Sequence, residues 1–326
     1  MRILERALVC VLFGLSATSF AQAPSTAEPF PLRPVRLIIP YPPGAVANGV
    51  GRMVTEKLSA TWGQPVVVDN RPGGNGIIGT NAIAKSKPDG YSVGLILASQ
   101  AITPLLFKAL PYDTERDLVQ VSLVAEYPFL LLVNNAFPGR TVGDFIRIAK
   151  SMPNKVTFAS SGVGSGPHLA IELLNMSAGI KLAHVPYKGG GPALADVAGG
   201  HVDAFYSSLL SAQPLISAGK IRAIGVTSPK RFEALPDVPA FAEILSGFSA
   251  TGWVGLIAPT GTPLHVVNSI SEHVAHYVRQ PDMRSRLLAN GLEPRGTTPS
   301  EFAHFFRSET QKYRKVISAN NITADH

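Results

Sequence analysis

The sequence predicts an α/β protein of two lobes, each built on a doubly wound, mainly parallel sheet flanked by helices. Three observations predict this class. Short β-branched apolar runs alternate with helix-spaced segments, the alternation starts again near Ser122, and the chain ends in three consecutive predicted helices. Such alternation is typical of sheets that bind ligands at the carboxyl ends of their strands. A length of 326 residues suffices for about two packed domains.

Residues 1–23 are expected to form a secretory signal peptide. Two arginines precede the apolar run 7–15, and small residues offer cleavage sites after Ala21 or Ala23. The run is too short to cross a bilayer as a helix, so we expect a periplasmic protein with no membrane span in its mature form. Cys10 is the chain's single cysteine and lies inside this run, so neither disulfides nor thiolate chemistry is expected.

The first lobe begins with a strand–helix–strand unit. The predicted elements are a strand at 35–41, a helix at 48–61, a strand at 65–68, a glycine-rich turn at 70–79 leading to a helix through residue 84, and a strand at 91–98. The strands are apolar runs bounded by turn residues, and the helices repeat apolar residues at helical spacing. This order of elements predicts parallel pairing.

The second half of the chain repeats the alternation and then changes to helices. The predicted elements are strands at 129–133, 156–159, 183–186, 204–206, 223–227 and 252–258, and helices at 142–150, 168–178, 192–198, 263–278, 282–290 and 299–319. Thr298 and Glu301 give the last helix a capping box. Three helices after one strand indicate a return to the first lobe. We therefore predict lobe 1 from residues 24–125 and 249–326, and lobe 2 from 126–248.

The segment 158–168 (FASSGVGSGPH) is the most informative candidate site. A predicted strand leads into a glycine and serine loop, and Pro167 fits the first turn of a helix. Backbone N–H groups at such a helix start, together with the helix dipole and serine hydroxyls, favour an anion. The alternative is a capped tight turn that binds nothing. The loop lacks both the lysine of a phosphate loop and the third glycine of a dinucleotide fingerprint.

Three further segments lie at predicted strand ends. The loop 41–48 (YPPGAVAN) is the counterpart of the anion loop in the first lobe, and Asn48 is expected to cap the helix that follows. Tyr187 is expected to wall the cleft, with Lys188 facing solvent or attracting an anion. Asp203 is expected to cap a loop or accept a hydrogen bond from the ligand, because one carboxylate without a partner is weak evidence for acid–base catalysis.

Other chemistries receive little support from the sequence. Ser92 stands in a G-x-S-x-G pattern, but a turn precedes it and a strand follows it, which inverts the context of a hydrolase nucleophile. His273 and His276 are three residues apart on a predicted helix without a third ligand. The formal charge of +7 comes from scattered lysines and arginines, so nucleic acid is not expected as a partner. Neither a metal nor a cofactor is expected.

The motifs together resemble the Bug family, the extracytoplasmic solute receptors associated with tripartite tricarboxylate transporters. They are YPPG, GQPVVVDNRPGG, KPDGY, LPYDTERDL, FASSGVGSGPHLA, HVPYKGGGPAL, AIGVTS, ALPDVPAFAE and IAPTGTP, and they extend over nearly all of the predicted mature chain. The resemblance implies a type II-like periplasmic binding protein that closes on a small carboxylate in the cleft between its lobes. It also implies that the two loops clasp one carboxylate, partly through ordered water.

The expected ligand-binding residues follow from the loops and from this resemblance. They are Tyr41, Pro43, Gly44, Ala45, Ala47, Asn48, Ser99, Gln100, Ser160, Ser161, Gly162, Ser165, His168, Tyr187, Asp203 and Ser207. Two departures from the family pattern stand out. Ala47 and Asn48 occupy positions where a Thr-Asp pair is common, and Ser207 stands where many members carry Asp. The second change removes an acidic partner for a ligand ammonium and argues against amino acids.

The sequence therefore predicts a monomeric receptor that captures a dicarboxylate, a tricarboxylate or an aromatic acid without performing chemistry. Closure by hinge motion would present the ligand to the permease subunits of a tripartite tricarboxylate transporter. Two alternatives remain. One is a ligand-sensing adaptor for the ectodomain of a sensor kinase, and the other is an exported serine hydrolase that uses Ser92 or a cleft serine with His168.

Overall fold

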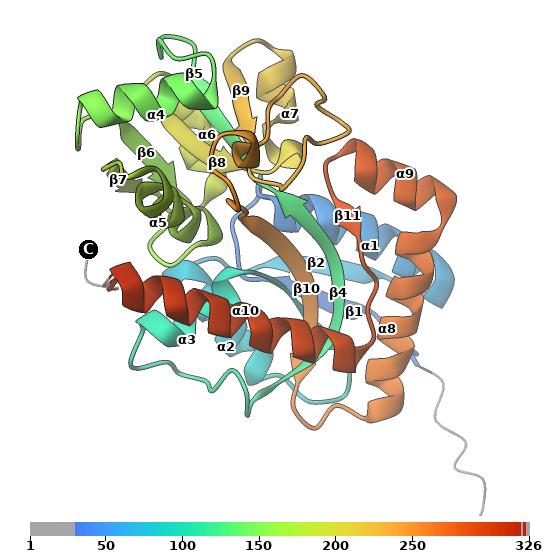
Figure 1. Cartoon of the computed structure of the whole chain (residues 1–326). Helices are drawn as coiled ribbons and strands as arrows, with labels where there is room; N and C mark the ends of the chain where they lie inside the picture. The colour runs from blue at the N-terminus through green and yellow to red at the C-terminus, as the bar shows by residue number, and fades with distance from the viewer. Residues whose placement is uncertain (1–29, 321, 324–326) are drawn as a thin grey trace, which may run out of the picture.

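The structure, a computed structural model, describes residues 30–320, 322 and 323, and contains two mixed sheets flanked by helices (Figure 1). The predicted signal peptide lies outside the described residues. Within the described part of the chain, no helix is both long and apolar enough to cross a membrane. The two-lobed α/β class predicted from the sequence is confirmed.

The first sheet has six strands in the order β11-β4-β10-β3-β1-β2. Its strands are β1 (Val35–Ile39), β2 (Val66–Asn70), β3 (Ser92–Leu97), β4 (Leu118–Pro128), β10 (Thr251–Pro259) and β11 (Glu293–Pro294). The helices of this part of the chain are α1 (Val46–Trp62), the short η1 (Gly74–Gly76), α2 (Ile77–Ala84), α3 (Ser99–Leu106), α8 (Leu264–Arg279), α9 (Pro281–Ala289) and α10 (Pro299–Asn320).

The second sheet has five strands in the order β7-β6-β8-β5-β9. Its strands are β5 (Leu130–Asn134), β6 (Thr157–Ser160), β7 (Ala183–Pro186), β8 (Ala204–Ser207) and β9 (Ile221–Val226). Its helices are α4 (Val142–Ser151), α5 (Gly166–Ala178), α6 (Gly190–Ala198), α7 (Leu209–Ser217) and the short η2 (Phe241–Glu243). The chain passes from the first sheet to the second between β4 and β5, and it returns to the first sheet between β9 and β10. The lobe boundaries at 125/126 and 248/249 remain a proposal that is compatible with this order.

The sheets differ from the expectation in that they are mixed rather than mainly parallel. In the first sheet β10 runs antiparallel to both β3 and β4, and in the second sheet β5 runs antiparallel to both β8 and β9. The reason is topological. A strand that enters a lobe from the other lobe starts at the gap between the sheets and runs away from it, whereas β1–β4 and β6–β9 run toward the gap.

Two helices were missing from the sequence prediction. Pro104 lies inside α3 and Pro214 lies inside α7, and an internal proline normally argues against a helix because it removes a backbone donor. Strand β4 also begins before residue 122, where the alternation was expected to resume. The capping box of α10 is confirmed, because the Thr298 N–H donates to Glu301 Oε2 at 2.8 Å and the Glu301 N–H donates to Thr298 Oγ1 at 3.3 Å.

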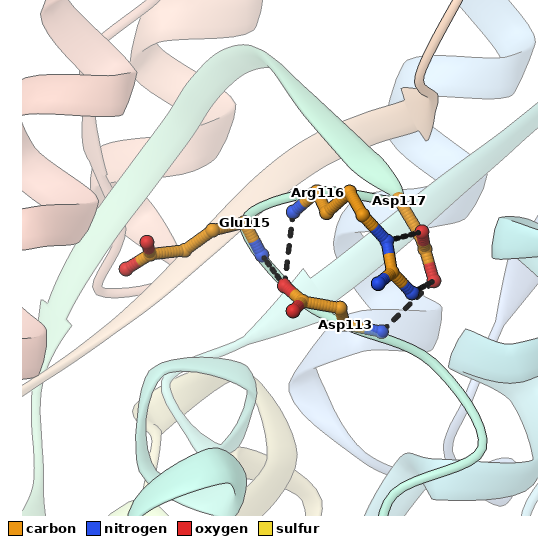
Figure 2. A network of polar contacts seen from close by, with 4 residues as sticks. All are labelled: Asp113, Glu115, Arg116 and Asp117. Atoms are coloured by element: carbon orange, nitrogen blue, oxygen red, sulfur yellow. Dashed lines mark hydrogen bonds and ion pairs between the residues drawn. The ribbon is translucent and has the colours of Figure 1, made fainter.

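The LPYDTERDL motif forms a compact polar loop before β4. Figure 2 shows Asp113 accepting from the backbone N–H groups of Glu115 and Arg116, while Asp117 accepts from the Asp113 N–H. Arg116 Nε lies 2.8 Å from Asp117 Oδ1, and this contact lowers the pKa of Asp117 to about 2. The motif that contributes to the family resemblance therefore has a structural role, in fixing the entry into β4.

Helix α10 is fixed to the first sheet by a buried polar contact. Trp253 on β10 is fully buried, and its Nε1 donates to Glu309 Oε2 at 3.1 Å, while Lys312 Nζ lies 2.5 Å from Glu309 Oε1. Glu309 is only 7% exposed. Because both groups are buried, the indole N–H would have no acceptor without this carboxylate.

We predict that Glu309→Ala lowers the free energy of unfolding by about 1–3 kcal/mol, because the buried indole N–H loses its acceptor. Glu309→Gln keeps an acceptor oxygen and should cost less. Urea unfolding followed by tryptophan fluorescence measures both variants. Equal losses in the two would contradict a contribution from the indole contact.

Candidate ligand-binding site

A cavity of about 700 Å³ lies between the carboxyl ends of the two sets of parallel strands. Its lining comes from two groups of segments. Residues 40–42, 45, 46, 72–76, 97–99, 107, 127 and 129 follow or end strands of the first sheet or lie beside them. Residues 161–163, 165–167, 187–190, 205–208 and 211 do so in the second sheet. The cavity is therefore where the direction of the strands predicts a ligand site.

Helix N-termini surround this cavity. Helices α1, α3, α5, α6 and α7 all begin among its lining residues. Ser165 and Ser208 are the N-caps of α5 and α7, and their hydroxyls accept from the third amide of each helix at 3.3 Å. The other N–H groups of a first helical turn have no partner inside the helix. With about half a positive charge at each helix start, the cavity is suited to an anion.

Lys188 is the only formally charged side chain among the described lining residues, and it is exposed. The lining contains no Asp or Glu that would pair with a ligand ammonium. Backbone amides at the helix starts supply part of its polar groups, and the uncharged polar side chains of the lining are the tyrosines, Asn75, Ser99, Ser161, Ser165, Ser207, Ser208 and Ser211. The positive potential thus comes mainly from the backbone, and the described lining offers no carboxylate to a cation.

Tyr41 connects two of the loops that line the cavity. Its hydroxyl accepts from the Leu97 N–H at 3.1 Å and lies 2.8 Å from Ser99 Oγ. Burial raises the pKa of Tyr41 to about 12 despite these contacts. Its backbone carbonyl accepts from Asn70 Nδ2 at 2.9 Å. The phenol therefore stays neutral and fixes the end of β1 against the start of α3.

Two stacked histidines contact the glycine and serine loop at residues 160–166. The rings of His168 and His184 lie 4.2 Å apart at 14°. His168 Nδ1 accepts from the Gly164 N–H at 3.1 Å, and His184 Nε2 lies 2.6 Å from Ser160 Oγ. Ser160 also accepts from the Gly162 N–H at 3.1 Å. These contacts position the loop, and neither histidine lines the cavity.

Of the residues considered for hydrolysis, Ser92 and His168 lie outside the cavity lining, whereas cleft serines such as Ser161 and Ser165 belong to it. Ser160 contacts a histidine but is fully buried. Ser92 is the first residue of β3, has the inverted context that the sequence indicated, and accepts from Arg36 Nη2 at 3.1 Å. Among the described residues, no three His, Cys, Asp or Glu side chains gather where they could hold a metal ion.

Half of the predicted site residues line the cavity. They are Tyr41, Ala45, Ser99, Ser161, Gly162, Ser165, Tyr187 and Ser207. The others do not line it, namely Pro43, Gly44, Ala47, Asn48, Gln100, Ser160, His168 and Asp203.

The residues outside the lining have identifiable structural contacts. Asn48 was expected as an N-cap, which is wrong, because α1 starts two residues earlier with Ala45 at the cap position; Asn48 Nδ2 instead donates to Pro42 O at 3.1 Å. Gln100 bonds Thr80 and Thr114 inside the first lobe. Asp203 Oδ2 accepts from the N–H and the hydroxyl of Thr157, both at 2.8 Å. That carboxylate lies at the amino end of β8, opposite the cavity.

Sequence reasoning missed the aromatic part of the lining. It consists of Phe107, Tyr127, Phe129, Phe205 and Tyr206, in addition to Tyr41 and Tyr187. The missed residues lie in or beside apolar strand runs or at a helix end, where an aromatic side chain normally indicates core. Residues 72–76 of the glycine-rich turn also line the cavity, although no role in binding was assigned to them.

The two lobes are in contact beside the cavity. A Cβ atom added to Gly189 would lie 2.5 Å from Pro42 Cγ, and one added to Gly191 would lie 3.4 Å from the Pro43 carbonyl oxygen. The YPPG loop of the first lobe therefore packs directly on the glycines at the start of α6, and a side chain at Gly189 would separate the two.

A two-lobed α/β protein with helix N-termini directed into a cavity between its lobes has the architecture of a periplasmic solute-binding protein. The family model "Tripartite tricarboxylate transporter family receptor" matches residues 50–322. BugT of Bordetella pertussis is 34% identical over 316 residues, which cover 95% of this chain and 96% of BugT. The chain therefore belongs to the tripartite tricarboxylate transporter receptor family, which is a family of solute-binding receptors rather than enzymes.

Solved structures of relatives agree with this assignment. An R. palustris protein solved with adipate has a TM-score of 0.88 and 32% identity, over 90% of this chain and 99% of that protein. MatC from Rhodopseudomonas palustris, solved with bound malate, has a TM-score of 0.81 and 30% identity, over 88% of this chain and all of MatC. Both relatives are thus similar along nearly the whole described chain.

Burial of His184 predicts a pH dependence of stability. Burial lowers its pKa from 6.5 to about 4, so between these values the unfolded chain binds a proton that the folded chain does not. The free energy of unfolding should therefore decrease as the pH falls from 6.5 to about 4. His184→Gln should flatten this part of the profile, measured by urea unfolding at stepped pH. The same change at exposed His201 is the control, and an unaltered slope in His184→Gln would contradict the interpretation.

The contact between Gly189 and Pro42 predicts that Gly189→Ala holds the lobes apart. The added methyl group would collide with Pro42, and Gly189 also has a φ of +120°. Gly179→Ala is a matched control in the same lobe, because Gly179 has a φ of +61° but no atom within 4 Å of the added Cβ. Small-angle X-ray scattering should give a larger radius of gyration for Gly189→Ala only. Identical scattering from both variants would refute the steric argument.

Proposed function

We propose that the protein is a periplasmic receptor that binds a small carboxylate between its lobes and delivers it to the permease subunits of a tripartite tricarboxylate transporter. The observation that carries this proposal is the convergence of five helix N-termini on one cavity whose described lining has no acidic side chain. Relatives solved with adipate and with malate support a carboxylate as the ligand class. The predicted signal peptide supports export to the periplasm.

The carboxylate is bound by the backbone in this proposal. Its oxygens accept hydrogen bonds from the Gly166 N–H and from the start of α1, and the serine hydroxyls of the lining add further donors. Hydrogen bonds to an ionised acceptor are about twice as strong as neutral ones. Because the donors belong to different lobes, the ligand stabilises the arrangement in which the lobes are in contact, which is the condition for ligand-driven closure.

A pair of N-cap variants separates binding from helix stability. Ser165 caps α5 at the cavity, and Thr141 caps α4, where its Oγ1 accepts from the Asp144 N–H at 3.1 Å away from the cavity. Removing either cap should cost about 1 kcal/mol of stability. Only Ser165→Ala should also weaken carboxylate binding, by roughly tenfold, because it removes a hydroxyl from the binding loop.

The measurement is calorimetric titration and thermal melting of the protein and both variants against a panel of mono-, di- and tricarboxylates. A ligand at about 100 times its dissociation constant adds about 2.7 kcal/mol to stability. If no carboxylate stabilises the folded protein, the proposed function is wrong. If Thr141→Ala weakens binding as much as Ser165→Ala does, the assignment of the α5 N-terminus as the anion site is wrong.

A further inference from the structure

The turn between β2 and α2 brings one side chain to the cavity from a left-handed backbone. Residues 73–76 have φ angles of +129°, +54°, +53° and +92° in order, and among these four only Asn75 is not a glycine. A residue with a Cβ atom is uncommon in this region, although asparagine tolerates it better than most. Glycine would adopt the same backbone without that penalty, so what Asn75 adds at this position is its side chain.

The Asn75 amide lies at the cavity and against the second lobe. Asn75 is the only described lining residue with a side-chain amide, and it is partly exposed. A Cβ atom added to Gly164 would lie 3.2 Å from Asn75 Nδ2, and one added to Gly162 would lie 4.0 Å from Asn75 Oδ1. A turn of the first lobe thus places its amide against the glycine and serine loop of the second lobe, where two glycines leave room for it.

The contacts of this amide leave most of its hydrogen-bonding capacity unused. Asn75 Nδ2 donates to Thr103 Oγ1 on α3 at 3.4 Å, a length at which a hydrogen bond is weak. No other hydrogen bond joins the Asn75 side chain to the described part of the chain. An asparagine with a structural role in a turn commonly bonds its own backbone two residues on, and Asn75 does not. One N–H donor and the carbonyl oxygen therefore remain for another partner.

We infer that Asn75 is a ligand-binding residue of the first lobe, whose side-chain N–H donates to the carboxylate bound at the start of α5. This inference rests on the proposed function and adds a residue to its site. Gly164 stands two residues before Gly166, whose N–H is the donor proposed for the carboxylate, so the amide approaches that group from the opposite lobe. The contact exists only while the lobes are together, and the carboxylate then joins donors from both.

Two substitutions remove the amide donor without disturbing the turn. Asn75→Gly adopts a positive φ freely, and Asn75→Asp keeps the shape of the side chain and tolerates the same region. Neither variant should have a lower melting temperature than the unmodified protein. Asn154→Gly and Asn154→Asp are the matched controls, because Asn154 also has a left-handed backbone, with a φ of +58°, but is exposed and does not line the cavity.

Calorimetric titration measures the effect on binding. The unmodified protein is titrated with the panel of mono-, di- and tricarboxylates, which includes benzoate, adipate, malate and citrate, and the acid with the lowest dissociation constant becomes the probe. Asn75→Gly should weaken binding of this probe roughly tenfold, because a hydrogen bond to an ionised acceptor is lost. Asn75→Asp should weaken it roughly a hundredfold, because a negative charge then faces the carboxylate. Both Asn154 variants should bind like the unmodified protein.

Small-angle X-ray scattering without ligand separates a ligand contact from a contact that only holds the lobes together. Asn75→Gly and the unmodified protein should have the same radius of gyration. A larger radius in Asn75→Gly would assign Asn75 to the contact between the lobes and overturn its role in binding. Unchanged affinity in either Asn75 variant would also overturn that role, while leaving a carboxylate receptor in place. Failure of every acid in the panel to bind the unmodified protein would overturn the proposed function, and this contact with it.

Discussion

The position of the site depends on the direction of the strands, most of which end at the gap between the lobes. β1–β4 and β6–β9 all end at this gap, so the helices that follow several of them start there with their N-termini inward. The two crossing strands, β5 and β10, begin at the gap instead, and the short β11 also runs antiparallel to β4. The topology thus creates a positive backbone potential at the cavity without placing charged residues inside it.

The same constraint places the two crossings between the sheets next to the cavity. The two crossings are joined by Thr227, which is fully buried. Its N–H donates to the Phe129 carbonyl at 2.9 Å, the Phe129 N–H donates to Thr227 Oγ1 at 2.8 Å, and the Ala250 N–H donates to the Thr227 carbonyl at 3.1 Å. Phe129 therefore belongs both to a crossing between the sheets and to the cavity lining.

The sequence predicts those parts of the site that depend on the local chain. A strand followed by a glycine and serine loop and a capped helix is readable in one segment, and Ser161, Gly162 and Ser165 line the cavity accordingly. The sequence does not predict site features that arise from contacts between distant segments. Asp203 stands next to a site strand in the sequence, yet it lies at the far end of that strand and bonds Thr157. Phe129 looks like a core residue until the crossing of the lobes brings the start of α5 against it.

A cavity whose positive potential comes from backbone amides also avoids the cost of a buried charged side chain. A buried arginine facing an anion would lose its hydration when the lobes meet, and without the ligand it would remain unpaired at a cost of several kcal/mol. First-turn amides carry only partial charges, are fixed by the helix, and are solvated by water when no ligand is present. The formal charge of +7 then acts at longer range, raising the local concentration of anions around the molecule, while the helix termini supply the directional hydrogen bonds.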